Sequence, residues 1–204
     1  MWSILEVISI SFASGPGWRS VADKIMVTRG TVMVIGRVDT GKSTFCRYLA
    51  SVALKQGLKT GVVDADIGQS WIGPPTTVGM KIVSEEPSPT LFPDSFYFVG
   101  SVSPEGHLLQ TAVGTRCMVD EARNSGAELV IVDTTGLVDR RKGRDLKLSK
   151  IELINPDHII CFQRVSELES LIRGIEPCFR CCIHRLEPSK GVKRKSQNSR
   201  RIYR

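Results

Sequence analysis

The chain has 204 residues, of which 41% are hydrophobic and 24% charged, proportions that are usual for a soluble globular protein. This length suffices for one α/β domain with a full core, and no apolar run approaches the roughly 18–20 residues of a membrane helix. The N-terminus carries an acid at Glu6 and lacks the basic region of a signal peptide. We therefore expect a cytoplasmic protein with no membrane segment.

The net charge of +7 is concentrated at the C-terminus. The last twenty residues contain eight of the 28 lysines and arginines but only one of the 21 acids, so the rest of the chain is neutral. A segment of this kind either binds phosphate, on a nucleic acid or a nucleotide, or is a solvated chain end. Composition alone favours neither interpretation.

Short apolar runs rich in β-branched residues alternate with amphipathic helical patterns. The apolar runs predict strands over residues 31–36, 60–67, 96–100, 128–133 and 157–163. The helical patterns predict helices over residues 42–55, from about 109 to 117, and from about 166 to 174. Residues 70–95 are rich in Pro, Gly and Ser, which predicts a long loop. This alternation indicates a three-layer α/β fold with a mostly parallel sheet.

A phosphate-binding motif lies between the first predicted strand and the first predicted helix. It reads Gly36-Arg37-Val38-Asp39-Thr40-Gly41-Lys42-Ser43 and has the P-loop form G-x-x-x-x-G-K-[ST]. Its glycines let backbone N–H groups turn toward a phosphate, and the helix that follows, with Thr44 in its first turn, adds a partial positive charge. We expect Lys42 to contact the β- and γ-phosphates and the Ser43 hydroxyl to bind Mg²⁺. The sequence therefore predicts a P-loop NTPase fold with ATP and Mg²⁺ as cofactors.

Three aspartates stand where predicted strands end. Asp64 and Asp66 close the second strand, and Asp133 closes a later one. Ligands of parallel α/β sheets bind at the carboxyl ends of the strands, where a carboxylate can hold a metal through water or accept a hydroxyl proton. We therefore predict functional roles for Asp66 and Asp133, with Ser43, Asp66 and Asp133 around the metal.

The segment after Asp133 also tests a GTPase interpretation. Asp133-Thr134-Thr135-Gly136 has the D-x-x-G form that contacts a γ-phosphate. A GTPase would also carry an N-K-x-D element after a later strand. Here that strand ends in Cys161-Phe162-Gln163-Arg164, which disfavours a GTPase.

Residues 62–80, VVDADIGQSWIGPPTTVGM, with the P-loop before them and V-D-T-T-G-L-V after them, resemble the P-loop domain of polynucleotide 5′-hydroxyl kinases. That family includes the RNA kinases of pre-mRNA, tRNA and ribosomal-RNA processing and archaeal relatives. The resemblance runs from about Trp18 to Arg204, and its most specific piece is D-x-G-Q followed by the Pro-Thr loop. It implies ATP-dependent phosphorylation of the 5′-hydroxyl end of RNA or DNA.

The resemblance also implies roles for individual residues. Asp39 matches the aspartate of the family's P-loop, and Asp66, followed by Gly68 and Gln69, matches its base-like, metal-associated aspartate. Thr134 and Gly136 match the T-x-G clasp that closes over the phosphates. The family's lid helix has the form R-x-S-x-x-x-R-x-x-x-R, which is matched here by Arg194, Ser196, Arg200 and Arg204. Lys42, Asp66, Arg200 and Arg204 are thus the implied catalytic residues, with the two arginines stabilising charge on the transferred phosphoryl group.

The domain organisation follows from the same comparison. Residues 1–184 are expected to form the P-loop kinase domain, with 1–17 as a lead-in, and 185–204 a basic lid segment. Family members continue beyond the lid into a C-terminal domain, so we expect this chain to be truncated. Trp71, in the loop after Gln69, either stacks on a substrate base or fills the loop.

Two other functions are compatible with the sequence. One is an ATP-binding assembly subunit that transfers nothing. The other is a metallochaperone-like P-loop ATPase, for which the D-x-D of Asp64 and Asp66 is the matching feature.

Overall fold

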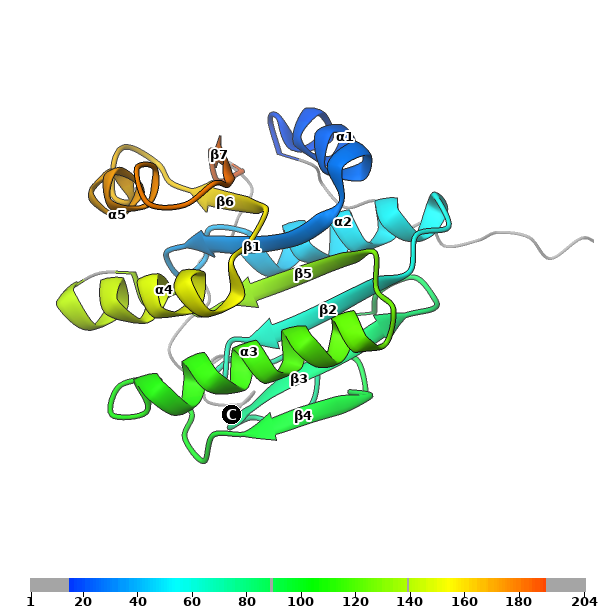
Figure 1. Cartoon of the computed structure of the whole chain (residues 1–204), viewed down its shortest axis with the longest axis horizontal. Helices are drawn as coiled ribbons and strands as arrows, with labels where there is room; N and C mark the ends of the chain where they lie inside the picture. Colours follow the sequence, from blue (N-terminus) through cyan, green and yellow to red (C-terminus); the bar gives the residue numbers. More distant parts are fainter. Residues whose placement is uncertain (1–14, 89, 139, 190–204) are drawn as a thin grey trace, which may run out of the picture.

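The computed structural model describes residues 15–88, 90–138 and 140–189 (Figure 1). Its strands form one sheet in the order β4-β3-β2-β5-β1-β6-β7. Only β3 runs against the others, because it pairs antiparallel with both β2 and β4. The predicted α/β fold with a mostly parallel sheet is confirmed. The strands are β1 (Gly30–Gly36), β2 (Thr60–Ala65), β3 (Thr77–Val83), β4 (Ser95–Phe98), β5 (Leu129–Thr134), β6 (His158–Phe162) and β7 (Cys182–Leu186).

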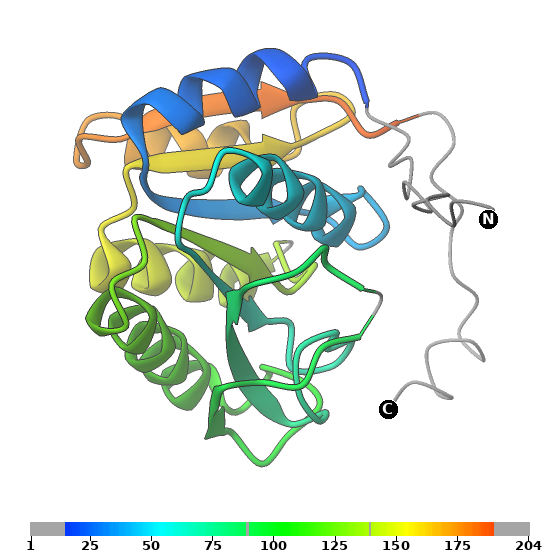
Figure 2. The same cartoon turned by 90° about the vertical axis from the view of Figure 1, so that its right-hand side faces the viewer.

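Helices cover both faces of the sheet and complete the three layers (Figure 2). One face carries α1 (Trp18–Thr28) and α2 (Lys42–Lys55), and the other carries α3 (Leu108–Asn124), α4 (Arg140–Ile154) and α5 (Glu169–Ile175). Successive side chains of β1 alternate between the two cores, as strand geometry requires. Val32 and Val34 pack with α1 and α2, whereas Met33 and Ile35 pack with Ile151 of α4 and residues of α5.

The predicted loop over residues 70–95 is wrong in its middle, where β3 forms. Thr77, Val78, Gly79 and Met80 are buried there. A Cβ on Gly79 would lie 2.2 Å from the carbonyl oxygen of Ile72, so this glycine allows a close approach of two backbones. The glycine that favoured a loop is therefore part of a strand.

Three further elements were not predicted: α1, α4 and β7. Helix α4 is rich in charged residues, and its buried positions include Lys147 and Lys150, so it shows no clear apolar stripe in sequence. No helix in the described part of the chain is long and apolar enough to cross a membrane.

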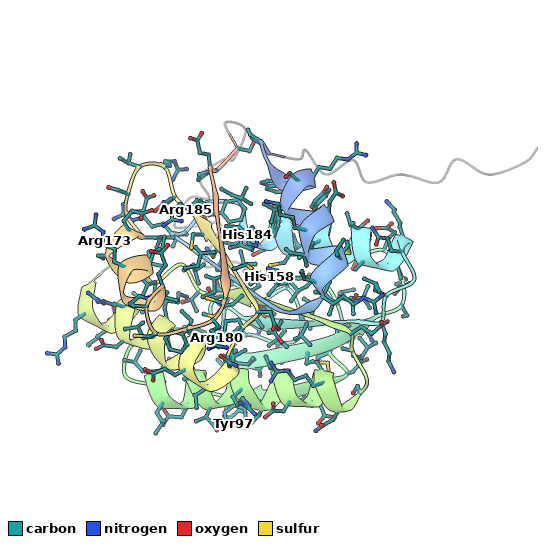
Figure 3. All side chains as sticks on the ribbon, turned by 45° about the horizontal axis from the view of Figure 1, so that its top comes forward. Tyr97, His158, Arg173, Arg180, His184 and Arg185 are labelled. Atoms are coloured by element: carbon teal, nitrogen blue, oxygen red, sulfur yellow. The ribbon has the colours of Figure 1, made fainter. Side chains whose placement is uncertain are left out.

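A histidine pair lies at the β6–β7 edge of the sheet (Figure 3). His158 Nδ1 is 3.1 Å from His184 Nε2, and His158 Nε2 is 2.7 Å from Thr28 Oγ1 at the end of α1. Burial lowers the pKa of His158, and burial together with His158 and Lys24 lowers the pKa of His184 to about 4. Both rings are therefore neutral near pH 7, one on β6 and the other on the edge strand β7, remote in sequence from the phosphate motif.

Candidate nucleotide site

The P-loop forms the turn between β1 and α2. Asp39 and Gly41 have positive φ angles of 54° and 95°, which an aspartate and a glycine tolerate better than most residues. Thr40 Oγ1 and Lys42 Nζ both donate hydrogen bonds of 2.8 Å to the carbonyl oxygen of Arg37. Lys42 is only 6% exposed. The predicted phosphate-binding residues from 36 to 44 thus occupy one tight turn and the first turn of α2.

The sheet register places the two strand-end aspartates beside each other. Asp133 of β5 pairs with Val34 of β1 on one side and with Asp64 of β2 on the other. Both carboxylates are fully buried. The pKa of Asp133 is raised by burial, although Lys42 and a hydrogen bond from the Ser43 side chain oppose this shift. Asp133 therefore lies next to the start of α2, as the sequence predicts for a metal-associated carboxylate.

One oxygen of Asp133 fits a metal ion. Its Oδ1 is buried and has no hydrogen-bond partner among the described residues. The Ser43 hydroxyl lies close to the same carboxylate. Mg²⁺ prefers oxygen ligands of these two kinds and usually keeps several waters. The residues present thus fit the ion that the P-loop implies.

Asp64 organises the loop that follows β2. Its Oδ2 accepts hydrogen bonds from Ser70 Oγ at 3.0 Å, Trp71 N at 2.6 Å and Ile72 N at 3.1 Å, and its Oδ1 accepts one from Asp66 N at 3.0 Å. Burial and the nearby charges of Asp133 and Asp66 raise the pKa of Asp64 to about 8. All of these bonds fold the chain back onto β2, so the structure gives Asp64 a structural task.

Asp66 lies at the start of the same loop and is half-buried. Its Oδ1 accepts hydrogen bonds of 3.2 Å from the backbone N–H groups of Gly68 and Gln69. Gly68 is tightly packed, because a Cβ there would lie 2.5 Å from the carbonyl oxygen of Val102. The D-x-G-Q sequence therefore fixes the orientation of the Asp66 carboxylate through its own backbone.

Trp71 fills the loop instead of presenting a stacking surface. Its side chain is 3% exposed, and its indole N–H donates to Asp133 Oδ2 at 3.2 Å. The Arg47 guanidinium lies 4.4 Å from the ring centroid, within cation–π distance. Of the two interpretations of Trp71, stacking on a substrate base is wrong for this structure.

The segment after β5 packs against the P-loop. Thr134 Oγ1 donates a 2.7 Å hydrogen bond to the carbonyl oxygen of Val34. A Cβ on Gly136 would lie 2.4 Å from Val38 Cγ2 and 2.6 Å from Val38 N, so only glycine allows this contact. Gly136 thus lies against the P-loop, and Thr134 is bonded to β1 just before it.

Lys147 of α4 joins this segment and was missed by the sequence analysis. Its ammonium group donates to Thr134 Oγ1 at 2.9 Å and to the Thr135 carbonyl at 2.7 Å. A lysine between Leu146 and Leu148, three residues from a second lysine at 150, was the available signal. The expected lid residues, Arg194, Ser196, Arg200 and Arg204, lie outside the described residues.

A mostly parallel sheet covered on both faces, with a Gly-Lys-Ser turn after β1 and a carboxylate at the end of the neighbouring strand β5, is the architecture of P-loop NTPases. Comparison with known proteins gives the family. The profile described as "mRNA cleavage and polyadenylation factor CLP1 P-loop" matches residues 36–204, and the chain belongs to this family.

Similar proteins include archaeal enzymes named polyribonucleotide 5′-hydroxyl kinase. The chain is 37% identical to that of Pyrococcus horikoshii over 148 residues, which are 72% of this chain and 40% of the relative. It is 40% identical to that of Thermococcus kodakarensis over 149 residues, 72% of this chain and 42% of the relative. The chain therefore spans about two-fifths of the length of these relatives.

Solved structures share the fold at low sequence identity. The wild-type Clp1p–Pcf11p complex matches with a TM-score of 0.76 and 16% identity, over 91% of this chain and 51% of that one. The kinase domain of the Escherichia coli tyrosine kinase ETK matches with a TM-score of 0.51 and 15% identity, over 88% and 76%. These similarities concern the arrangement of the sheet and helices.

Proposed function

We propose that this chain binds ATP and transfers its γ-phosphate to the 5′-hydroxyl end of RNA or DNA, in the cytoplasm. The observation that carries the proposal is the convergence of three segments at one edge of the sheet: the P-loop, the Asp66 loop and residues 134–136. Relatives 37–40% identical over most of the chain are named as kinases of this kind.

The phosphate-binding side of the site belongs to the P-loop. Lys42 leaves the Arg37 carbonyl and contacts the β- and γ-phosphates, while backbone N–H groups of the turn and of the start of α2 hold the remaining oxygens. Ser43 and Asp133, with Asp66, would hold Mg²⁺, which would neutralise part of the phosphate charge. Thr134 and Gly136 cover the phosphates from the other side of the loop.

The acceptor side belongs to Asp66. Its carboxylate, oriented by the N–H groups of Gly68 and Gln69, positions the 5′-hydroxyl and accepts its proton. Arg200 and Arg204 of the C-terminal basic segment stabilise negative charge as the phosphoryl group moves. The kinase domain extends to Leu186, because β7 pairs with β6 in the same sheet, so the boundary expected after residue 184 falls inside a strand. Phosphoryl transfer needs mainly positioning and electrostatic stabilisation, and the residues assembled here provide both.

The test is to incubate the chain with γ-labelled ATP, Mg²⁺ and 5′-hydroxyl oligonucleotides of RNA and of DNA. We expect label on the oligonucleotide, and its loss in Lys42→Ala and Asp66→Asn. The asparagine keeps an acceptor for the Gly68 and Gln69 N–H groups, so its effect isolates the negative charge. Lys55→Ala is the matched control, because Lys55 ends the same helix with a side chain 70% exposed.

Other results would support the rival functions. ATP binding with no labelled oligonucleotide would favour the assembly subunit, and release of free phosphate without transfer would favour the metallochaperone-like ATPase. Either outcome would overturn the kinase proposal.

A further inference from the structure

Helix α4 covers the face of the sheet opposite α2 (Figure 2), and two of its lysines are buried. Lys147 and Lys150 are both 0% exposed and, being three residues apart, lie on one side of the helix. Lysine is almost never fully buried without a partner. The burial of these two side chains therefore needs an explanation, and their surroundings differ.

Only Lys147 is hydrogen-bonded. Its ammonium group donates to Thr134 Oγ1 and to the Thr135 carbonyl at 2.9 and 2.7 Å. Lys150 Nζ has no hydrogen-bond partner in the part of the chain that the structure describes. Burial and the charges of Lys150 and Lys42 lower the pKa of Lys147 well below its usual range. Burial lowers the pKa of Lys150 to about 8, against the opposing charges of Asp66, Asp64 and Asp133.

The hydrogen bonds of Lys147 continue toward the P-loop. Thr134 donates its hydroxyl proton to the Val34 carbonyl at 2.7 Å, so it receives the Lys147 N–H on its oxygen. Thr134 is thereby held between α4 and β1. Two residues later Gly136 packs against Val38 within the P-loop.

Lys147 itself is sealed from solvent, so it acts through the segment it holds. Without Lys147, the Thr135 carbonyl and the second site on Thr134 Oγ1 would lose their buried donor, and residues 134–136 would lose their tie to α4. A loop that must be ordered during binding reduces affinity, whereas a pre-ordered loop does not.

We propose that Lys147 is a positioning residue of the nucleotide site, which holds residues 134–136 against the P-loop and so keeps the loop ready for phosphate. Lys150, equally buried on the same helix face, makes no hydrogen bond to residues 134–136 in the part of the chain that the structure describes. The inference rests on the ATP-binding half of the proposed function and is independent of the phosphate acceptor.

The experiment compares Lys147→Met with Lys150→Met in the full chain. Each substitution replaces a buried lysine by an apolar side chain of similar length. The readouts are affinity for a fluorescent ATP analogue, without nucleic acid, and the thermal unfolding temperature. We expect Lys147→Met to weaken nucleotide binding about tenfold, as the loss of a buried hydrogen bond predicts, and Lys150→Met to leave affinity within about twofold.

A double-mutant cycle with Thr134→Val separates positioning from general destabilisation. Because one of the two hydrogen bonds of Lys147 goes to Thr134, the affinity losses of the two single variants should be less than additive in the double variant. Thr134→Ser, which keeps the hydroxyl, should retain affinity. If Lys147→Met does not fold, Lys147→Gln keeps a donor without charge and should bind the analogue more weakly than Lys150→Met does.

Three results would overturn the inference. They are unchanged affinity in folded Lys147→Met, losses that add in the double variant, and equal losses at 147 and 150. A wild-type chain that binds the analogue but labels no oligonucleotide would overturn the kinase proposal alone.

Discussion

Replacing Gly136 by alanine tests whether residues 134–136 and the P-loop fit as closely as the structure has them. The new Cβ would lie 2.4 Å from Val38 Cγ2, 2.6 Å from Val38 N and 2.8 Å from Val38 Cα. The side chain of Val38 can turn away, but its backbone cannot move without shifting the P-loop. Overpacking of this kind costs about 1–3 kcal/mol. Gly136 has no left-handed φ, so the cost is steric alone.

If the P-loop is displaced in Gly136→Ala, the steric cost reduces the free energy of nucleotide binding. At about 1.4 kcal/mol per factor of ten, ATP affinity should fall about 5- to 150-fold, as measured by titration with a fluorescent ATP analogue. Gly174→Ala in α5 is the control, because its nearest neighbour is the side chain of Arg144 at 3.4 Å and no positive φ is needed. A Gly136→Ala protein that binds ATP as tightly as the control would refute the close contact.

Further predictions concern three other parts of the molecule. Trp71→Phe removes the buried donor to Asp133 and should lower the free energy of unfolding in urea by about 1–3 kcal/mol; Trp18→Phe should cost less, because the Trp18 indole N–H makes no hydrogen bond in the described structure. The pKa of His184 is lowered to about 4, so the unfolded chain takes up a proton near pH 6.5 before the folded protein does. Stability should therefore fall between pH 6.5 and 4 by about 1–2 kcal/mol, allowing for partial exposure, and thermal melts of His184→Gln should show a shallower fall; parallel curves would contradict this. Burial raises the pKa of Cys161 to about 12 and that of Cys46 well above its usual range, so iodoacetamide should modify these two thiols only after denaturation. Peptide mass spectrometry should instead find native labelling at the exposed cysteines, Cys117, Cys178 and Cys182.

The sequence predicts the elements correctly where the local residue pattern and the tertiary structure agree. The P-loop lies between strand and helix as its pattern requires, and the helix expected over residues 42–55 is α2. Strand ends were placed within about two residues, because β-branched runs bounded by glycine or aspartate stop where the sheet stops. These features depend on contacts near in sequence.

The features that escaped prediction depend on distant contacts. Lys147 is charged, so helix α4 looks solvent-exposed until Thr134 and Thr135 are known to receive its N–H groups. Gly79 suggests a turn until Ile72 is known to pass against it. Asp64 cannot be told from Asp66 by its place at a strand end, since only the folded loop shows which carboxylate the backbone surrounds. In each case the residue that makes the contact lies on another segment, and the local sequence pattern does not indicate where that segment lies in the fold.

The burial of Trp71 has a practical consequence. Its indole N–H is bonded to the carboxylate that fits a metal ion, and its ring faces the Arg47 cation. Indole emission responds to the electric field across the ring, so a divalent cation at Asp133 changes the field that Trp71 senses. Trp18 shares the core with Trp71 but makes its ring contacts with Phe45, Tyr48 and Phe162. With Trp2 and Trp18 replaced by phenylalanine, the protein would carry its own optical reporter of magnesium, without an added dye.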